Sequence, residues 1–248
     1  VCSSDLIPEI FASEGEAGFR VRETEALKSL LGTKNHVVAT GGGIVTQPVN
    51  LPLLKQLGFV GVLLYSNLAG AWCDEPQFHW LFAQAEQLDV PILLHPAKPM
   101  TTEQVKGYEL TSTLGNMFEN TIALARIIAS GLLDRHPKLK LVCPHLGGSL
   151  PYICGRMDHQ LHVLKRGPQN LQRKPSEYLR SIYMDIVSPL PEAMRFAIDF
   201  GSPDNLLFSS DHPWVQPQEI LDPFYSLNLS EADQNKILFE NARRLFRL

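Results

Sequence analysis

The segment LKLVCPHLGG, residues 139–148, runs from apolar side chains into His145 and two glycines. Two other segments share this plan: PILLHP, residues 91–96, presents His95, and NLLFSSDHP, residues 205–213, presents Asp211. A short apolar run bounded by turn-forming residues is typical of a buried strand. Histidine and aspartate bind metals and transfer protons, so these three strand ends are the candidates for chemistry.

The apolar runs alternate with segments of helical length. Strands are also expected in GVLLYS (61–66) and IYMDIV (182–187). Helices are expected over residues 75–89, 119–131, 190–200 and 230–246. Nearly continuous apolar strands alternating with helices predict a parallel sheet covered on both faces. The fold class is therefore α/β, an incomplete TIM-type (β/α) barrel with about five of eight strands, whose site collects at the C-terminal strand ends.

Two helix starts are indicated by polar residues. Asn120 or Thr121 is expected to cap the helix over 119–131, because apolar residues follow at spacings of three and four. Ser230 and Asp233 form a capping-box arrangement at the start of the last helix. A further helical region is expected over residues 7–33.

Composition excludes several classes of protein. The chain has 248 residues, a net charge of −4 and 44% hydrophobic residues, and its basic residues are scattered, so no nucleic-acid partner is expected. No apolar run reaches the roughly 18 residues that span a membrane. The first residues, VCSSDL, lack the basic and apolar segments of a signal peptide. Four cysteines without a C-x-x-C pair favour a reduced, cytoplasmic protein.

Each candidate residue has a structural alternative. A histidine at a strand end is often held by structural hydrogen bonds, and an aspartate there often caps the next helix. Three such residues in one alternating pattern favour a functional site. The Asp134-x-His136 pair has the spacing of paired ligands, but it precedes its strand and is rejected as a metal site. Structural roles are expected for five of the other histidines, which are His36, His79, His136, His159 and His162.

Residues 59–248 resemble the C-terminal two-thirds of the amidohydrolase-related family that includes aminocarboxymuconate-semialdehyde decarboxylase and the resorcylate-type decarboxylases. The resemblance is carried by the segments GFVGVLLYSN, TIALARIIASGLLDRHPKLKLVCPHLGGSLPYICGRMDH, KPSEYLRSIYMD, NLLFSSDHP and ENARRLF. It implies a metal-dependent hydrolase or non-oxidative decarboxylase of a small carboxylic acid, and a possible homodimer.

The same resemblance implies roles for individual residues. His95 and Asp211 are expected to bind a divalent metal, with zinc as the expected ion. His145 and Asp211 are expected to be catalytic, with His145 activating metal-bound water or handling the proton of the substrate. Arg156, in GRMDH, is expected either to hold a substrate carboxylate or to lock a loop. The sequence does not distinguish zinc from manganese as the bound ion.

The front of the chain resembles shikimate kinase. This resemblance is carried by IPEIFASEGEAGFRVRETEALKSLL (7–31) and HVVATGGGIV (36–45). It implies that Arg20 and the glycines Gly41, Gly42 and Gly43 hold shikimate. The phosphate-binding sequence G-x-x-x-x-G-K-[ST] does not occur, so this fragment is expected to be non-functional as a kinase. The expected domains are therefore residues 1–58 and 59–248.

The His-x-His pair that the first resemblance requires on an earlier strand is also missing from the sequence. Only His95 and Asp211 remain as recognised ligands, against the usual three or four, so weak metal binding is expected. Three hypotheses follow: an impaired metal-dependent enzyme, an inactive chimera, or a shikimate-binding fragment. The two halves are either a genuine fusion or a joining error in the reconstructed sequence, which genomic DNA across codons 45–65 would distinguish.

Overall fold

The computed structural model of the protein describes residues 6–33, 40, 44 and 47–248. The chain divides into two compact units, residues 1–60 and 61–248. Each unit is described by itself.

The first unit contains two described helices that contact each other, α1 (Leu6–Ser29) and α2 (Asn50–Gln56). The predicted helical region thus exists, although Gly15 interrupts α1 with a left-handed φ of 68°. Leu27 of α1 is buried, and α2 buries Leu51 and Leu54. The segment HVVAT (36–40), which carries part of the shikimate kinase resemblance, lies outside the described residues apart from Thr40, as do Gly41, Gly42 and Gly43.

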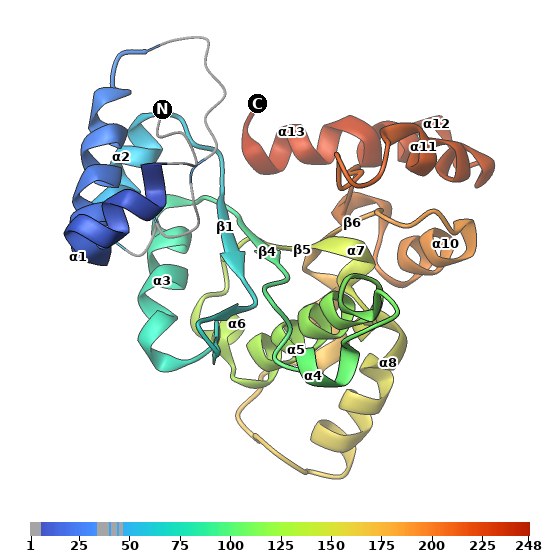
Figure 1. The fold of residues 1–248 in the computed structure, drawn as a ribbon. Coiled ribbons are helices and arrows are strands. Elements are labelled where there is room, and N and C mark those ends of the chain that lie inside the picture. Colours follow the sequence, from blue (N-terminus) through green and yellow to red (C-terminus); the bar gives the residue numbers. More distant parts are fainter. Residues whose placement is uncertain (1–5, 34–39, 41–43, 45–46) are drawn as a thin grey trace. The chain divides into compact units, whose positions relative to one another are not determined.

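The second unit is built on a parallel sheet of five strands in the order β1-β4-β5-β6-β7 (Figure 1). This confirms the predicted α/β class and the five expected strands. Their bounds are β1 Val62–Tyr65, β4 Ile92–His95, β5 Leu141–Cys143, β6 Tyr183–Asp185 and β7 Leu206–Leu207. A separate antiparallel pair joins β2 (Asn67–Leu68) to β3 (Ala71–Trp72).

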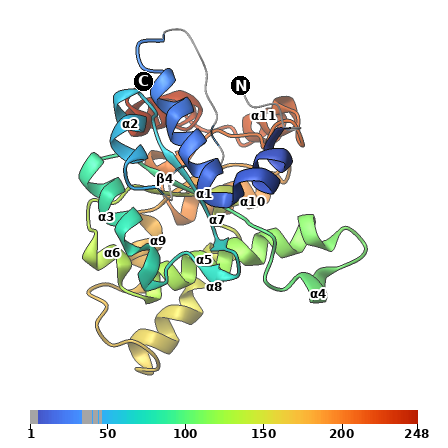
Figure 2. The ribbon, with the colours of Figure 1, turned by 60° about the vertical axis from the view of Figure 1, so that its left-hand side comes forward.

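Helical segments connect these strands. Those before β6 are η2 Pro76–Phe78, α3 His79–Leu88, α4 Thr102–Val105, η3 Thr111–Gly115, α5 Asn116–Ala129, α6 Leu132–Arg135, α7 Pro144–Gly147, α8 Leu150–Met157, η4 Asp158–Val163 and α9 Pro175–Arg180. Those after β6 are α10 Pro191–Phe200, η5 Pro203–Asn205, α11 Pro217–Ser226, α12 Glu231–Asn235, η6 Lys236–Glu240 and α13 Asn241–Phe246. Figure 2 shows α4 on an arm that projects from the sheet and leads into α5.

The predicted helix starts have different outcomes. Ser230 caps α12, since its hydroxyl accepts a hydrogen bond from the Asp233 amide at 3.1 Å. The prediction of a cap at Asn120 or Thr121 is wrong, because α5 begins at Asn116 and both residues lie buried inside it. The π-helical turn η3 runs directly into α5, so the helix needs no polar cap at Asn120.

The two faces of the sheet differ in how they are covered. Alternate residues such as Leu64, Ile92 and Met184 lie on one face and are buried, the last of them among residues from α10 and α11. On the opposite face, Leu63 is 44% exposed and Tyr65 is 39% exposed. The sheet is therefore closed on its helix-covered side and open on the other side at β1.

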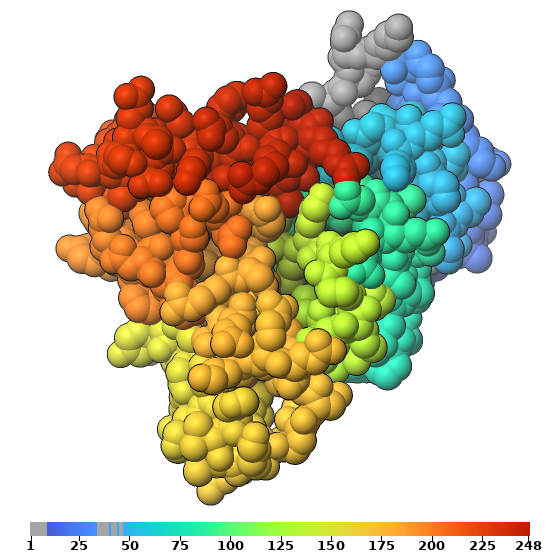
Figure 3. All heavy atoms as spheres, turned by 180° about the vertical axis from the view of Figure 1, so that it is seen from behind, coloured from blue at the N-terminus to red at the C-terminus, as the bar shows by residue number. Residues whose placement is uncertain are grey.

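Helix α13 covers part of that opposite face. Leu245 packs with Val142 and Leu207, and the Asn241 side chain donates to the Leu206 carbonyl at 2.8 Å. Arg247 pairs with Asp89, which precedes β4, so α13 lies where the strands begin (Figure 1). Seen from behind, the C-terminal helices in red lie against the orange segment that contains α10 (Figure 3).

We expect Leu124→Ala to lower the free energy of unfolding by about 2 to 5 kcal/mol, because Leu124 has no exposed surface and its loss leaves a cavity. Leu164→Ala is the matched control, since Leu164 is 42% exposed and should cost well under 1 kcal/mol. Urea denaturation of both variants measures the difference. Equal costs would contradict the assignment of the α5 face to the core.

Candidate functional site at the C-terminal edge of the sheet

Buried polar residues collect at the C-terminal edge of the sheet. Six of the eight buried polar residues described in the second unit belong to this group: Ser66, Asn67, Glu119, Asn120, Thr121 and Asp185. Hydrogen bonds of Ser66, Glu119 and Thr121 connect the loop after β1 and the turn after β5 with the first turns of α5, whereas the buried amide of Asn120 has no hydrogen-bond partner among the described residues. Burying polar groups costs free energy unless they are hydrogen-bonded, so a concentration of them marks a place that the fold maintains for another reason.

His95 is the last residue of β4, and its side chain is exposed. Its Nδ1 lies 2.8 Å from the Pro96 carbonyl oxygen. A carbonyl only accepts, so Nδ1 carries the proton and the neutral ring keeps a lone pair on Nε2. The Tyr65 ring stands edge-on to it, with centroids 5.8 Å apart. His95 thus has the form in which imidazole binds a metal.

His145 begins a left-handed turn directly after β5. His145 and Leu146 have φ values of 54° and 57°, and Gly147 and Gly148 continue with 75° and 64°. Left-handed geometry is costly for residues other than glycine, so the surroundings must hold the turn. The Asp185 carboxylate accepts from the His145 amide at 2.7 Å.

The two glycines of this turn are required by close neighbours as well as by φ. A Cβ at Gly147 would lie 2.8 Å from the Met184 sulfur, and one at Gly148 would lie 2.6 Å from Thr121 Oγ1. The Thr121 hydroxyl accepts from the Ser149 amide at 2.8 Å. The glycine pair therefore lets the turn pass close above α5 and β6.

Asp211 follows β7 and also has a left-handed φ, of 62°. Its backbone carbonyl accepts from the Trp214 amide at 3.0 Å, which closes a tight turn. The side chain is partly exposed. The three predicted residues therefore lie at or beyond the C-terminal ends of strands of one parallel sheet: His95 ends β4, His145 follows the neighbouring strand β5, and Asp211 lies beyond β7.

The described residues do not make a complete metal site. Among them, no group of three or more His, Cys, Asp or Glu side chains is placed to hold a metal ion. His95 has the chemistry of a ligand, but a divalent ion needs more donors than this edge gathers. The ligand roles of His95 and Asp211 stay predictions.

Two carboxylates that the sequence analysis missed hold this edge together. Glu119 is almost fully buried and accepts from Asn67 Nδ2 at 2.6 Å, Ser66 Oγ at 3.3 Å and the Met100 amide at 3.1 Å. Burial raises the pKa of Asp185, against the lowering effects of His145 and of backbone N–H groups. In the sequence Asp185 lies inside the strand expected over 182–187, and a glutamate at a helix start is ordinarily taken as exposed, so neither residue was singled out.

Arg156 lies apart from the strand-end residues. It is an exposed residue of α8 and lines a groove of about 440 Å³ between α5 and α8. The other lining residues include Thr121, Ile122 and Ile153, but not His95, His145 or Asp211. The substrate-binding role predicted for Arg156 gains no support from this placement and stays a prediction.

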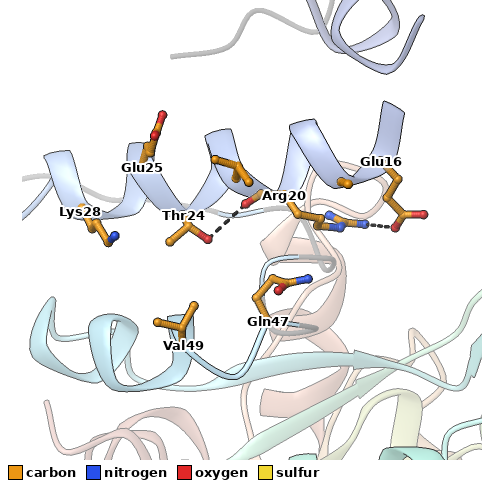
Figure 4. A pocket seen from close by; sticks show the side chains of 9 residues that line it. Glu16, Arg20, Thr24, Glu25, Lys28, Gln47 and Val49 are labelled. Carbon is orange, nitrogen blue, oxygen red and sulfur yellow. Dashed lines mark hydrogen bonds and ion pairs between the residues drawn. The ribbon is translucent and has the colours of Figure 1, made fainter. Parts of the chain in front are cut away.

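Arg20, the residue predicted to bind shikimate, lines a pocket of about 690 Å³ within the first unit (Figure 4). Its guanidinium is paired with Glu16 at 3.0 Å and Glu23 at 2.5 Å. Burial opposes the charge, but the hydrogen bonds that the guanidinium donates to Glu23 and Glu16 outweigh it and raise the pKa of Arg20. Two carboxylates already neutralise this cation, which disfavours its use for an anionic ligand.

The buried cysteines behave as small apolar residues. Burial raises the pKa of the Cys73 thiol to about 12, and it raises that of Cys143 further. Both thiols therefore stay protonated at neutral pH, where they are poor nucleophiles and poor metal ligands. Among the described helices, none is long and apolar enough to cross a membrane.

Comparison with known proteins places the chain in a family. The amidohydrolase family model matches residues 50–248, and the shikimate kinase model matches residues 3–69. The chain therefore belongs to the amidohydrolase family, and both resemblances drawn from the sequence are confirmed.

Gamma-resorcylate decarboxylase from Rhizobium sp. (strain MTP-10005) is 32% identical over 209 residues, which are 79% of this chain and 64% of that protein. The chain thus spans 64% of the length of the curated decarboxylases that it matches first. At the front, shikimate kinase from Acinetobacter baylyi is 55% identical over 60 residues, which are 24% of this chain and 33% of the kinase.

Solved structures show the same relationship. A 2,6-dihydroxybenzoate decarboxylase complexed with 2,6-dihydroxybenzoate gives a TM-score of 0.77 at 27% identity, covering 92% of this chain and 76% of that one. The dihydroxybenzoic acid decarboxylase of Polaromonas sp. JS666, with bound manganese and 2-nitroresorcinol, gives 0.77 at 25% identity, covering 95% and 76%. These neighbours agree with the predicted TIM-type (β/α) barrel class.

We expect Gly148→Ala to lower the free energy of unfolding by roughly 2 to 4 kcal/mol, because its Cβ would collide with Thr121 and would also sit at a left-handed φ. Gly107→Ala is the control, since Gly107 has a φ of +86° and open space around it. It should cost about 1 kcal/mol from φ alone. Similar costs in urea denaturation would show that the close approach is not required.

We expect Glu119→Ala to cost roughly 2 to 4 kcal/mol, because three donors would lose their buried acceptor. Glu103→Ala removes a carboxylate from an exposed pair with Lys106 and should change stability by less than about 0.5 kcal/mol. Chemical denaturation compares the two variants. A small cost at Glu119 would mean that water replaces the carboxylate and that the polar residues are not tightly connected.

Proposed function

We propose that residues 59–248 carry the C-terminal part of a metal-dependent decarboxylase that acts on a small, hydroxylated aromatic carboxylic acid. The observation that carries this proposal is the arrangement of His95, His145 and Asp211 after strands of one parallel sheet in a member of the amidohydrolase family. The named activities of the relatives favour decarboxylation over hydrolysis.

The chemistry fits the side chains at this edge. In non-oxidative decarboxylation the bond between the ring carbon and the carboxylate breaks, carbon dioxide leaves and a proton takes its place on that carbon. A positioned imidazole is suited to deliver this proton at neutral pH, and we assign that role to His145. His95, with its Nε2 lone pair directed away from Pro96, and Asp211 are assigned as ligands of a divalent metal.

The proposal covers a partial site. The metal in the Polaromonas relative is manganese, so we propose a divalent cation and leave the choice between manganese and zinc to experiment. Two recognised ligands predict weak binding and low activity in the chain as it stands. The competing proposal is that residues 1–58 and 59–248 form a chimera without catalytic function.

One experiment separates these proposals. The full chain is compared with a version in which residues 1–58 are replaced by the corresponding front segment of the Rhizobium decarboxylase. We expect the replaced version to release carbon dioxide from 2,6-dihydroxybenzoate with added manganese or zinc, and the full chain to do so weakly.

His145→Asn in the replaced version should lower kcat by about 10² to 10⁴-fold, the usual contribution of a proton-transfer residue. His159→Asn is the matched control, since His159 is an exposed residue of η4. Undiminished turnover without His145 would contradict its role. No metal-dependent turnover in the replaced version would favour the chimera without catalytic function.

A further inference from the structure

Asp185 is a buried carboxylate that contacts the turn of His145 from the neighbouring strand. It ends β6, which pairs in parallel with β5 through Cys143 and Met184. Its Oδ1 accepts hydrogen bonds from the His145 amide at 2.7 Å and the Val187 amide at 3.1 Å. The backbone N–H of Leu146 also acts on the carboxylate. Three amides from two strand ends therefore converge on one side chain.

Two of these hydrogen bonds come from the residues of the turn for which a left-handed φ is unfavourable, His145 and Leu146. Gly147 and Gly148 adopt left-handed φ at little cost, but His145 and Leu146 do not. An ionised carboxylate binds backbone amides about twice as strongly as a neutral acceptor does. The side chain that compensates the strain thus acts on the same two residues that carry it.

Electrostatics add a second contribution. The titratable groups that act on Asp185 are the His145 imidazole and the Cys143 thiol. Burial of Cys143 raises its pKa, so the thiol stays neutral and the imidazole is the partner that can carry charge. The imidazole lowers the pKa of Asp185 and so favours the ionised carboxylate, the form that binds the backbone amides most strongly.

We propose that Asp185 is the positioning residue of His145: its carboxylate holds the left-handed turn so that the imidazole is presented at the C-terminal edge of the sheet. The catalytic consequence rests on the function proposed above for His145. The positioning itself can be measured on the full chain without any turnover.

The test follows backbone amide signals of the ¹⁵N-labelled full chain by NMR as pH is varied. We expect the amide protons of His145 and Val187 to shift with one shared midpoint, above the ordinary aspartate value of 3.8, because both report the ionisation of Asp185. Asp185→Asn should abolish the shared titration and move the His145 amide signal upfield. It should also make unfolding roughly tenfold to a hundredfold more favourable.

Two further variants make the result specific. His145→Gln should raise the Val187 midpoint, since the imidazolium that lowers the pKa of Asp185 is gone. Asp74→Asn makes the same chemical change at a similarly buried carboxylate that pairs with Arg126, and it should leave both amide titrations intact.

An unchanged His145 amide signal in Asp185→Asn, or separate midpoints for His145 and Val187, would overturn the proposal. In the version with the Rhizobium front segment, Asp185→Asn should lower kcat while leaving KM within about twofold. If that version proves inactive, the proposed function fails, while the amide titration still decides the role of Asp185.

Discussion

Two buried carboxylates, Glu119 and Asp185, hold the C-terminal edge of this sheet together through their hydrogen bonds. Glu119 and Asp185 lose their hydrogen bonds to water on folding. Donors on neighbouring segments replace those hydrogen bonds. Glu119 thereby connects the loops that follow β1 and β4, and Asp185 connects the ends of β5 and β6. Asp185 holds the turn of His145, whereas His95 is placed by the pairing of β4 with β1.

The sequence predicts the parts of this arrangement that periodicity controls. The five apolar runs became the five strands, and His95, His145 and Asp211 follow strands as expected, because a short apolar run ending in a polar residue has few other structures available. The start of α5 was mispredicted, since Asn120 and Thr121 look like caps in sequence and are buried in the structure. Neither Glu119 nor Asp185 could be recognised, because their role depends on donors up to 53 residues away in the chain.

The two ends of the sheet differ in a way that bears on function. Towards the start of β4, Arg247 at the end of α13 pairs with Asp89, and along the strands α13 packs Leu245 against Val142 and Leu207. Where the strands end, Tyr65 and His95 are exposed on the same face. Apolar contact therefore stabilises one end, and hydrogen bonds of polar groups maintain the other.

The apolar core and the polar edge are thus built from largely different residues. Large buried apolar side chains such as Leu124 and Phe224 belong to helices that pack on the sheet, and they are not among the hydrogen-bonded residues of the edge. The left-handed turn at His145 and the buried Glu119 add strain and desolvation cost instead. Strain and buried polar groups of this kind are typical of sites that need a fixed geometry. Here the strained turn includes His145, the residue proposed for proton transfer. The strain at His145 is therefore a stronger argument for a functional edge than the presence of the histidine alone.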